Sequence, residues 1–240
     1  MKSLHSRLKS IAEHPVRTFV LLLGLAAAAA LIFNLMNTPA CQVIGGTGAD
    51  GKVYIIDPGH GGFDGGAVSP SGTVESQINL EVAARLDLFM RYIGQTTRMT
   101  RRGDDALNEG GASIREKKVS DLKNRVRLVN SVENGILVSI HQNMFTDPRY
   151  SGAQVFYGKV SGSRELAEAI QKNIGSSLDL GNDREVKPVP GGVYLMSRAE
   201  CTAVLIECGF MSNFNEEQKL KDPNYQKKIA VVIGLSLLSQ

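Results

Sequence analysis

The sequence predicts an α/β fold: a mainly parallel or mixed sheet of about six strands, flanked by helices on both faces and preceded by one N-terminal transmembrane helix. Two observations support this fold class. Apolar runs of strand length alternate with segments in which apolar residues recur at steps of three and four. One segment near the N-terminus has no ionisable side chain and stands apart from this alternation.

The chain before the sheet divides into a leader, an anchor and a linker. Residues 1–17 hold four basic residues and one acid, and are interpreted as a cytoplasmic leader. Residues 18–36 are apolar, and at about 1.5 Å per residue they just span a hydrocarbon core of about 30 Å. Basic residues before this segment and none just after it predict an uncleaved anchor and an exported body. A cleaved signal peptide with a secreted body is the alternative.

Residues 37–51 are rich in Gly, Thr and Ala, nearly uncharged, and predicted to form a flexible linker. Six apolar runs then have the length of strands. They are residues 52–57, 96–100, 136–140, 152–158, 193–196 and 203–208. The body from 52 to 240 is therefore predicted to hold the whole sheet.

Four segments of the body have helical periodicity. They are residues 77–94, 114–131, 163–178 and a C-terminal stretch from about 225. In the first, Ile78, Val82 and Leu86 lie at four-residue steps. The third is expected to open on Ser163 as its cap, and the last has a wide apolar face.

The charges of the body exclude a nucleic-acid partner. Four of the 27 basic residues and one of the 24 acidic residues lie before residue 41, which leaves 23 of each sign in 41–240. A neutral body offers no basic surface for a phosphate backbone. Cys201 and Cys208 lie seven residues apart in an expected strand, about 23 Å when extended, which is too far for a disulfide.

Three side chains that can carry chemistry stand at the ends of apolar strands. His60 and His141 are the two histidines beyond the leader, and Glu207 lies in AVLIEC. The carboxyl ends of strands in an α/β sheet meet at one edge, so we expect these groups at one rim. A buried unpaired carboxylate costs several kcal/mol, so Glu207 needs a cation, a proton or a strong hydrogen-bond partner. An ion pair with a basic residue is the structural alternative.

A catalytic zinc ion typically takes three protein ligands and keeps one position open. His60 and His141 supply two donors, and Glu75 is the candidate third, because the glycine-rich loop after His60 can fold the next helix over the strand end. For Glu75 the alternative is a first-turn carboxylate that balances the helix dipole.

Five blocks, in order and at matching spacing, resemble the zinc-dependent N-acetylmuramoyl-L-alanine amidases (amidase type 3), which cut bacterial peptidoglycan. The resemblance covers residues 52–240, the expected catalytic domain. Its blocks are IIDPGHGGFDGGAVSPSGTVESQINLEVAARL, MTRRGDDAL, DLKNRVRLVN, VSIHQN and AVLIECGFMSN. The short N-terminal segment, with SGAQVFYG and GGVYLM, is most similar to the germination-specific branch of the family in spore-forming bacteria.

The resemblance implies roles for individual residues. His60, Glu75 and His141 would bind Zn²⁺, and Glu207 would be the catalytic acid/base. Asp57 and Asn143 match further motif positions and are expected near the metal or the substrate. The sequence departs from the family pattern at Gln142, at Cys208 and at SRAE, residues 197–200, which affects substrate contacts and packing and leaves the metal set unchanged.

The implied activity is hydrolysis of the amide between N-acetylmuramic acid and L-alanine, removing stem peptides during spore cortex maturation. The expected partners are peptidoglycan strands with their stem peptides, a membrane bound through the N-terminal helix, and an activating protein. A catalytically idle wall-binding module and a zinc carboxypeptidase acting within the stem peptide are the alternatives. A nucleophilic Cys208 is a further alternative, but side chains alternate along a strand, so Cys208 should point to the face opposite Glu207.

Overall fold

The computed structural model describes residues 51–239, which hold the whole sheet and its helices. The predicted leader, the anchor at 18–36 and nearly all of the linker lie outside the described residues. Within the described part, no helix combines the length and the apolar character needed to cross a bilayer.

The sheet has six strands, in the order β2-β1-β3-β6-β4-β5; the number agrees with the prediction, but the short strand β5 was not among the predicted runs. Their bounds are β1 Val53–Pro58, β2 Thr96–Met99, β3 Gly135–Asn143, β4 Gln154–Tyr157, β5 Lys187–Pro188 and β6 Thr202–Phe210. The first four in spatial order are parallel, β4 runs antiparallel to β6, and β5 is parallel to β4. The mixed sheet is thereby confirmed, with β1, β3 and β6 inside it.

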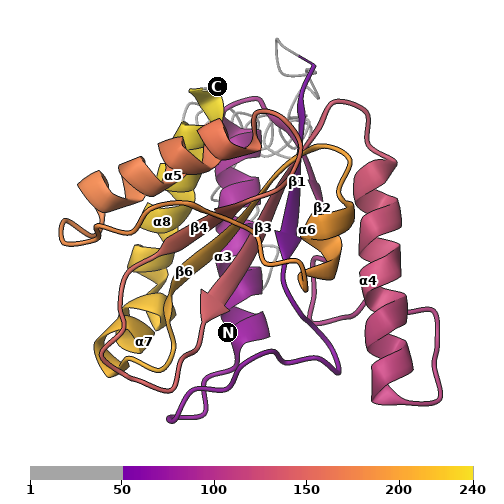
Figure 1. Cartoon of the computed structure of the whole chain (residues 1–240), viewed down its shortest axis with the longest axis horizontal. Helices are drawn as coiled ribbons and strands as arrows, with labels where there is room; N and C mark the ends of the chain where they lie inside the picture. Colours follow the sequence, from indigo (N-terminus) through magenta and orange to yellow (C-terminus); the bar gives the residue numbers. More distant parts are fainter. Residues whose placement is uncertain (1–50, 240) are drawn as a thin grey trace, which may run out of the picture. The chain divides into compact units, whose positions relative to one another are not determined.

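Helices cover both faces of the sheet, also as predicted (Figure 1). Their bounds are α3 Glu75–Tyr92, α4 Ile114–Asn130, α5 Ser163–Ser177, α6 Tyr194–Arg198, α7 Phe214–Lys221 and α8 Pro223–Leu238. Helices α3, α5 and α8 bury their apolar sides against one face, around Val138, Ile140 and Ile206. Helices α4 and α6 cover the other face, around Leu137 and Leu205.

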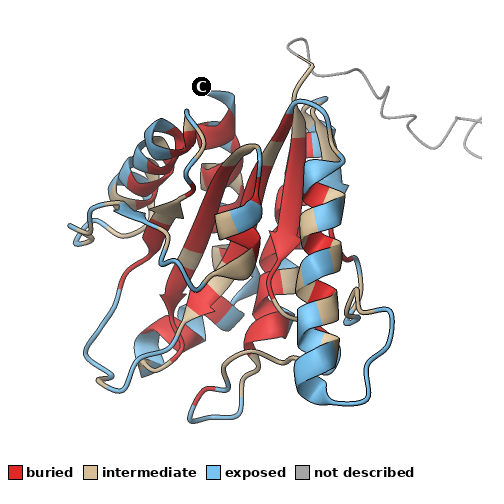
Figure 2. Cartoon of the chain, turned by 45° about the vertical axis from the view of Figure 1, so that its right-hand side comes forward, coloured by how far each residue is buried: buried red, intermediate tan, exposed pale blue. Residues whose placement is uncertain are grey.

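The alternation of buried residues along the central strands places their side chains on two faces. Figure 2 shows these strands buried along most of their length while the outer helix surfaces stay exposed. Burying both faces explains the nearly continuous apolar runs in the sequence.

Two local predictions are wrong. Residues 193–196 form most of the short helix α6 and not a strand, because Leu195 and Met196 are consecutive and both are buried in the second core cluster. Helix α5 is capped by Gly162, which has a positive φ of 83°, and no side chain caps it. Ser163 lies inside the helix, where its hydroxyl accepts a hydrogen bond from the Ala203 amide in β6.

Candidate metal centre

Three of the predicted site residues lie at the carboxyl edge of the parallel strands. His60 follows the end of β1, while His141 and Glu207 are register partners near the ends of β3 and β6. Residues of equal register on parallel strands project to the same face, which here is the face covered by α4 and α6. The expectation of one shared rim therefore holds for these three residues.

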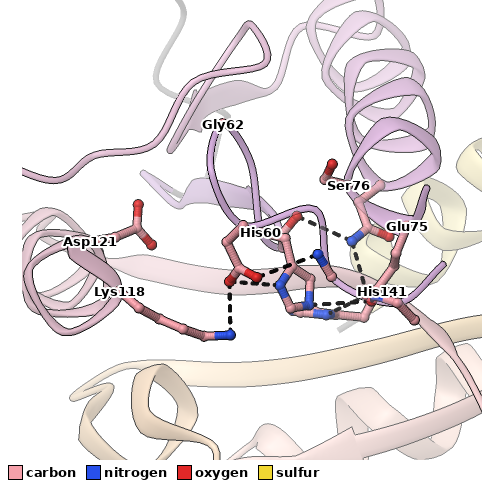
Figure 3. Close-up of polar contacts among 12 residues, drawn as sticks. His60, Gly62, Glu75, Ser76, Lys118, Asp121 and His141 are labelled. Carbon is pink, nitrogen blue, oxygen red and sulfur yellow. Dashed lines mark hydrogen bonds and ion pairs between the residues drawn. The ribbon is translucent and has the colours of Figure 1, made fainter. Parts of the chain in front are cut away.

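Glu75 joins the two histidines from a different element. It is the first residue of α3, and its carboxylate lies between the imidazoles (Figure 3). Its Oε2 is 3.3 Å from His60 Nε2, and its Oε1 is 3.0 Å from His141 Nδ1. One donor atom from each residue lies within 4.8 Å of the others. The structure thus brings together the two histidines and the glutamate that the sequence singled out.

The Glu75 carboxylate is held by hydrogen bonds that fix its direction. Its Oε2 accepts from the Ala67 amide at 2.9 Å, and its Oε1 accepts from Asn79 and from the Gln142 amide, both at 3.2 Å. Burial would raise the pKa of Glu75, but hydrogen bonds and charge from His141 and His60 outweigh it and hold that pKa well below its usual range. The group is therefore an anion aimed at both rings. Its place in the first turn of α3 also agrees with the alternative that this carboxylate balances the helix dipole.

The approach of the rings depends on unusual backbone in the turn after β1. His60 has a φ of 62°, a left-handed conformation that is uncommon for a residue with a side chain. Gly59 lies so close to the His141 ring that a Cβ atom there would overlap it. Burial lowers the pKa of His60, but Asp64 and Glu75 outweigh this effect and raise it to about 9.

Glu207 stands beside this group without a partner of its own. Its Oε2 is buried and has no hydrogen-bond partner within residues 51–239, and no ion pair to it is found there. Burial is the main reason that the pKa of Glu207 is raised to about 7. Over the described chain the ion-pair alternative therefore finds no support, and the carboxyl exchanges a proton near neutral pH.

Asp57 lines the same cavity as His60 and His141, whereas Asn143 lies at the end of β3. Asp57 is fully buried behind the site, where it pairs with Arg125 at 2.6 Å and accepts hydrogen bonds from Thr100 and Ser139. Burial would raise its pKa, but Arg125 and these donors keep it low. Asn143 ends β3, and its carbonyl accepts from the Met211 amide. Within residues 51–239, no hydrogen bond or ion pair joins the side chain of Asp57 or Asn143 to the His–Glu–His group.

Cys208 points away from the site. It is buried in the core cluster on the α3 and α8 face, and burial raises the pKa of its thiol to about 12. A protonated thiol on the opposite face of the sheet cannot act as a nucleophile beside Glu207.

Sequence reasoning missed Asp64. Its carboxylate lies 3.0 Å from His60 Nδ1 and 3.0 Å from Lys118 on α4. The available signal was an acid four residues after the histidine in the same glycine-rich turn.

A cavity of about 90 Å³ adjoins both histidines. Its walls include Lys118 and Leu122 from α4 and Tyr194 and Leu195 from α6. A larger hollow of about 600 Å³ runs along the outer side of α4 and contains none of the site residues. The smaller cavity is the relevant one, because the converging donor atoms lie beside it.

The fold and the site together define an α/β protein with a two-histidine, one-glutamate candidate metal centre at the carboxyl edge of its sheet. The family model for N-acetylmuramoyl-L-alanine amidase (amidase type 3) matches residues 55–238, and the chain belongs to this family. It is accordingly an N-acetylmuramoyl-L-alanine amidase, an enzyme that acts on peptidoglycan.

Similar proteins support this assignment at the level of the whole body. The germination-specific N-acetylmuramoyl-L-alanine amidase of Bacillus subtilis is 38% identical over 190 residues, covering 78% of this chain and 79% of the relative. The CwlD amidase of Clostridioides difficile, solved in complex with the GerS lipoprotein, has a TM-score of 0.75 at 38% identity, covering 78% of this chain and 97% of that one. A further amidase from Clostridium difficile 630 has a TM-score of 0.69 at 30% identity, with 78% and 95% covered.

Proposed function

We propose that this amidase is zinc-dependent and that His60, Glu75 and His141 hold the metal. The observation that carries the proposal is the convergence of three donor atoms within 4.8 Å beside a buried carboxylate. Two imidazoles and one carboxylate are a donor set that suits zinc and leaves a position open. Zinc bound there would supply Lewis-acid polarisation of water and of the amide carbonyl.

In this proposal Glu207 transfers the proton. A buried carboxylate without an ion-pair partner among the described residues can take a proton from the attacking water and return it to the amine of L-alanine as the amide C–N bond breaks. Glu207 suits this role because its Oε2 makes no hydrogen bond to residues 51–239 that would compete. His141, its register partner on β3, places a proposed metal ligand next to Glu207.

The cavity beside the histidines is the proposed entrance for the bond that is cut. Leu122, Tyr194 and Leu195 give it apolar walls on the side of α4 and α6. We therefore place the stem peptide on the α4 and α6 side of the sheet.

The biological setting we propose is the spore cortex, where removal of stem peptides leads to muramic lactam and permits germination. The likeness to the germination-specific relative over most of both chains supports this setting. The complex of the Clostridioides difficile enzyme with a lipoprotein also supports a role for a protein partner here. Residues 18–36 would anchor the enzyme in the membrane with its body outside the cytoplasm. Protease added to intact protoplasts should then remove the body. A soluble protein cleaved near residue 41 would contradict the anchor.

Digestion of purified peptidoglycan by the full chain tests the reaction. Mass spectrometry should find free stem peptides that begin with L-alanine, together with peptide-free glycan. Release of single amino acids from the stem would favour the carboxypeptidase, and absence of products with zinc loaded would favour the idle module. Cortex and vegetative peptidoglycan should be compared, because preferential cleavage of cortex is expected for the germination role.

A further inference from the structure

We infer that Asp64 is a positioning residue that sets the tautomer and the direction of the His60 imidazole for metal binding. The inference deepens the proposed function and rests on it. His60 Nδ1 lies 3.0 Å from Asp64 Oδ2, and Nε2 of the same ring lies 3.3 Å from Glu75 Oε2. The ring is therefore held at two edges by two carboxylates.

The two carboxylates have different places relative to the ligand group. Glu75 belongs to the set of converging donors, whereas Asp64 does not and lies behind the ring. A carboxylate on Nδ1 accepts its proton as a hydrogen bond, which leaves the lone pair of Nε2 for a metal. Such a partner also increases the basicity of the ligand nitrogen.

Asp64 is itself fixed in place before any metal binds. Its backbone amide and carbonyl pair with those of Gly61 at 3.1 and 2.7 Å, which closes the turn that follows His60. Its side chain bonds Lys118 of α4 at 3.0 Å and accepts a longer hydrogen bond from the Gly66 amide. These contacts hold the Asp64 carboxylate opposite Nδ1 of His60, whose own backbone is in the left-handed region.

His141 is held in another way. Its Nδ1 faces Glu75 at 3.0 Å, and the rest of its ring packs on Gly59. No second carboxylate forms a hydrogen bond or an ion pair with this ring in the part of the chain that the structure describes. Removal of the Asp64 carboxylate should therefore affect His60 and leave His141 as it is.

The test measures zinc affinity of the full chain in competition with a chromogenic chelator, together with the nitrogen-15 NMR signals of the His60 ring in zinc-free protein at a pH above the pKa of that ring, where the imidazole is neutral. Asp64→Leu should weaken zinc binding about 10- to 100-fold and change the ring from the Nδ1–H tautomer to a mixture. Asp64→Asn keeps an acceptor without charge and should weaken binding less. Thermal melting checks that both variants fold.

Asp104→Asn is the matched control. Asp104 accepts a hydrogen bond from the Gly62 amide at 3.0 Å, so it holds the same turn without contacting the ring. The control should keep the parental zinc affinity and His60 signals. Parental affinity and tautomer in Asp64→Leu would overturn the inference, and so would equal weakening in Asp104→Asn. If His60→Ala alone keeps parental zinc affinity, the proposed metal site fails instead.

Discussion

His141 and Glu207 occupy the same register position on the neighbouring parallel strands β3 and β6. The sheet backbone therefore sets the separation between a proposed zinc ligand and the proposed proton carrier. Both strands are paired on each side, β3 by β1 and β6, and β6 by β3 and β4. This rigidity allows the two roles to be separated by mutation.

Substitution of a proposed ligand should remove zinc. His60→Ala and His141→Ala each delete one of three donors, and Glu75→Gln replaces the anionic donor by a weaker neutral amide oxygen. Elemental analysis of the purified full chain should show zinc well below one per chain. Glu200→Gln, an exposed acid ahead of β6, should keep the parental content. Full occupancy in all three variants would show that the metal, if any, lies elsewhere.

Glu207→Gln should separate chemistry from metal binding. The amide keeps the shape of the side chain but cannot accept and return a proton, so amide cleavage should fall by about two to four orders of magnitude. Zinc content should remain near that of the parent, because Glu207 lies outside the converging donor group. The same preparations serve both measurements. An active variant would contradict the proton role, and a zinc-free one would make Glu207 a ligand.

The raised pKa of Glu207 predicts a pH dependence of stability in zinc-free protein. The carboxyl ionises near pH 4.3 when unfolded but at about 7 when folded, so the folded state binds more protons between these values. The free energy of unfolding of the parent should therefore decrease as pH rises through this range, because the buried Glu207 carboxyl loses its proton. Glu207→Gln has no carboxyl to ionise at this position, so its free energy of unfolding should rise relative to that of the parent from pH 5 to 7. Chemical denaturation with a chelator present measures the difference; a constant difference would contradict the prediction.

Glu217 of α7 should hold the loop that leads to Glu75. Its Oε1 accepts hydrogen bonds from Ser69 at 2.7 Å, from Thr73 at 2.5 Å and from Ser71. Glu217→Gln weakens this contact and should cost about 1–3 kcal/mol of stability. Faster hydrogen exchange in residues 65–74 and weaker zinc binding are the expected readouts.

The control for Glu217 is Lys221→Met. It removes only a 3.9 Å ion pair to the same carboxylate and should leave exchange in the loop unchanged. Unaltered exchange in Glu217→Gln would show that the hydroxyl contacts do not hold the loop.

Asp57 should be a main source of acid sensitivity. Asp57→Asn removes one of the two carboxylates that pair with Arg125 and leaves Asp121, at 2.8 Å, as the other, so it should cost about 1–3 kcal/mol at neutral pH. Because the folded pKa of Asp57 is lowered, its stabilisation is present at neutral pH and is lost as pH falls below about 4. The difference between parent and variant should therefore shrink in acid. Asp147→Asn breaks an exposed pair with Arg149 and should melt like the parent at every pH.

The sequence predicted the placement of His60, His141 and Glu207 because strand ends of a parallel sheet meet at one edge. Helix α6 was not predicted, since four apolar residues, 193–196, fit a buried strand or one helical turn equally well. The contact between Asp64 and His60 depends on positive φ values at His60, Gly61 and Gly62, which local residue pattern does not define. The contact of Glu217 spans more than 140 residues of sequence and exists only in the folded chain.

The loop of residues 61–74 joins two of the three proposed ligands, His60 at its start and Glu75 at its end, while His141 belongs to the sheet. A fluctuation that lifts this loop would withdraw two donors in one step and leave a single imidazole, which holds zinc weakly. Metal exchange would then be cooperative, with a rate set by loop opening and independent of the concentration of a chelator in excess. Stopped-flow mixing with such a chelator distinguishes this from direct attack on the ion, for which the rate rises with chelator concentration.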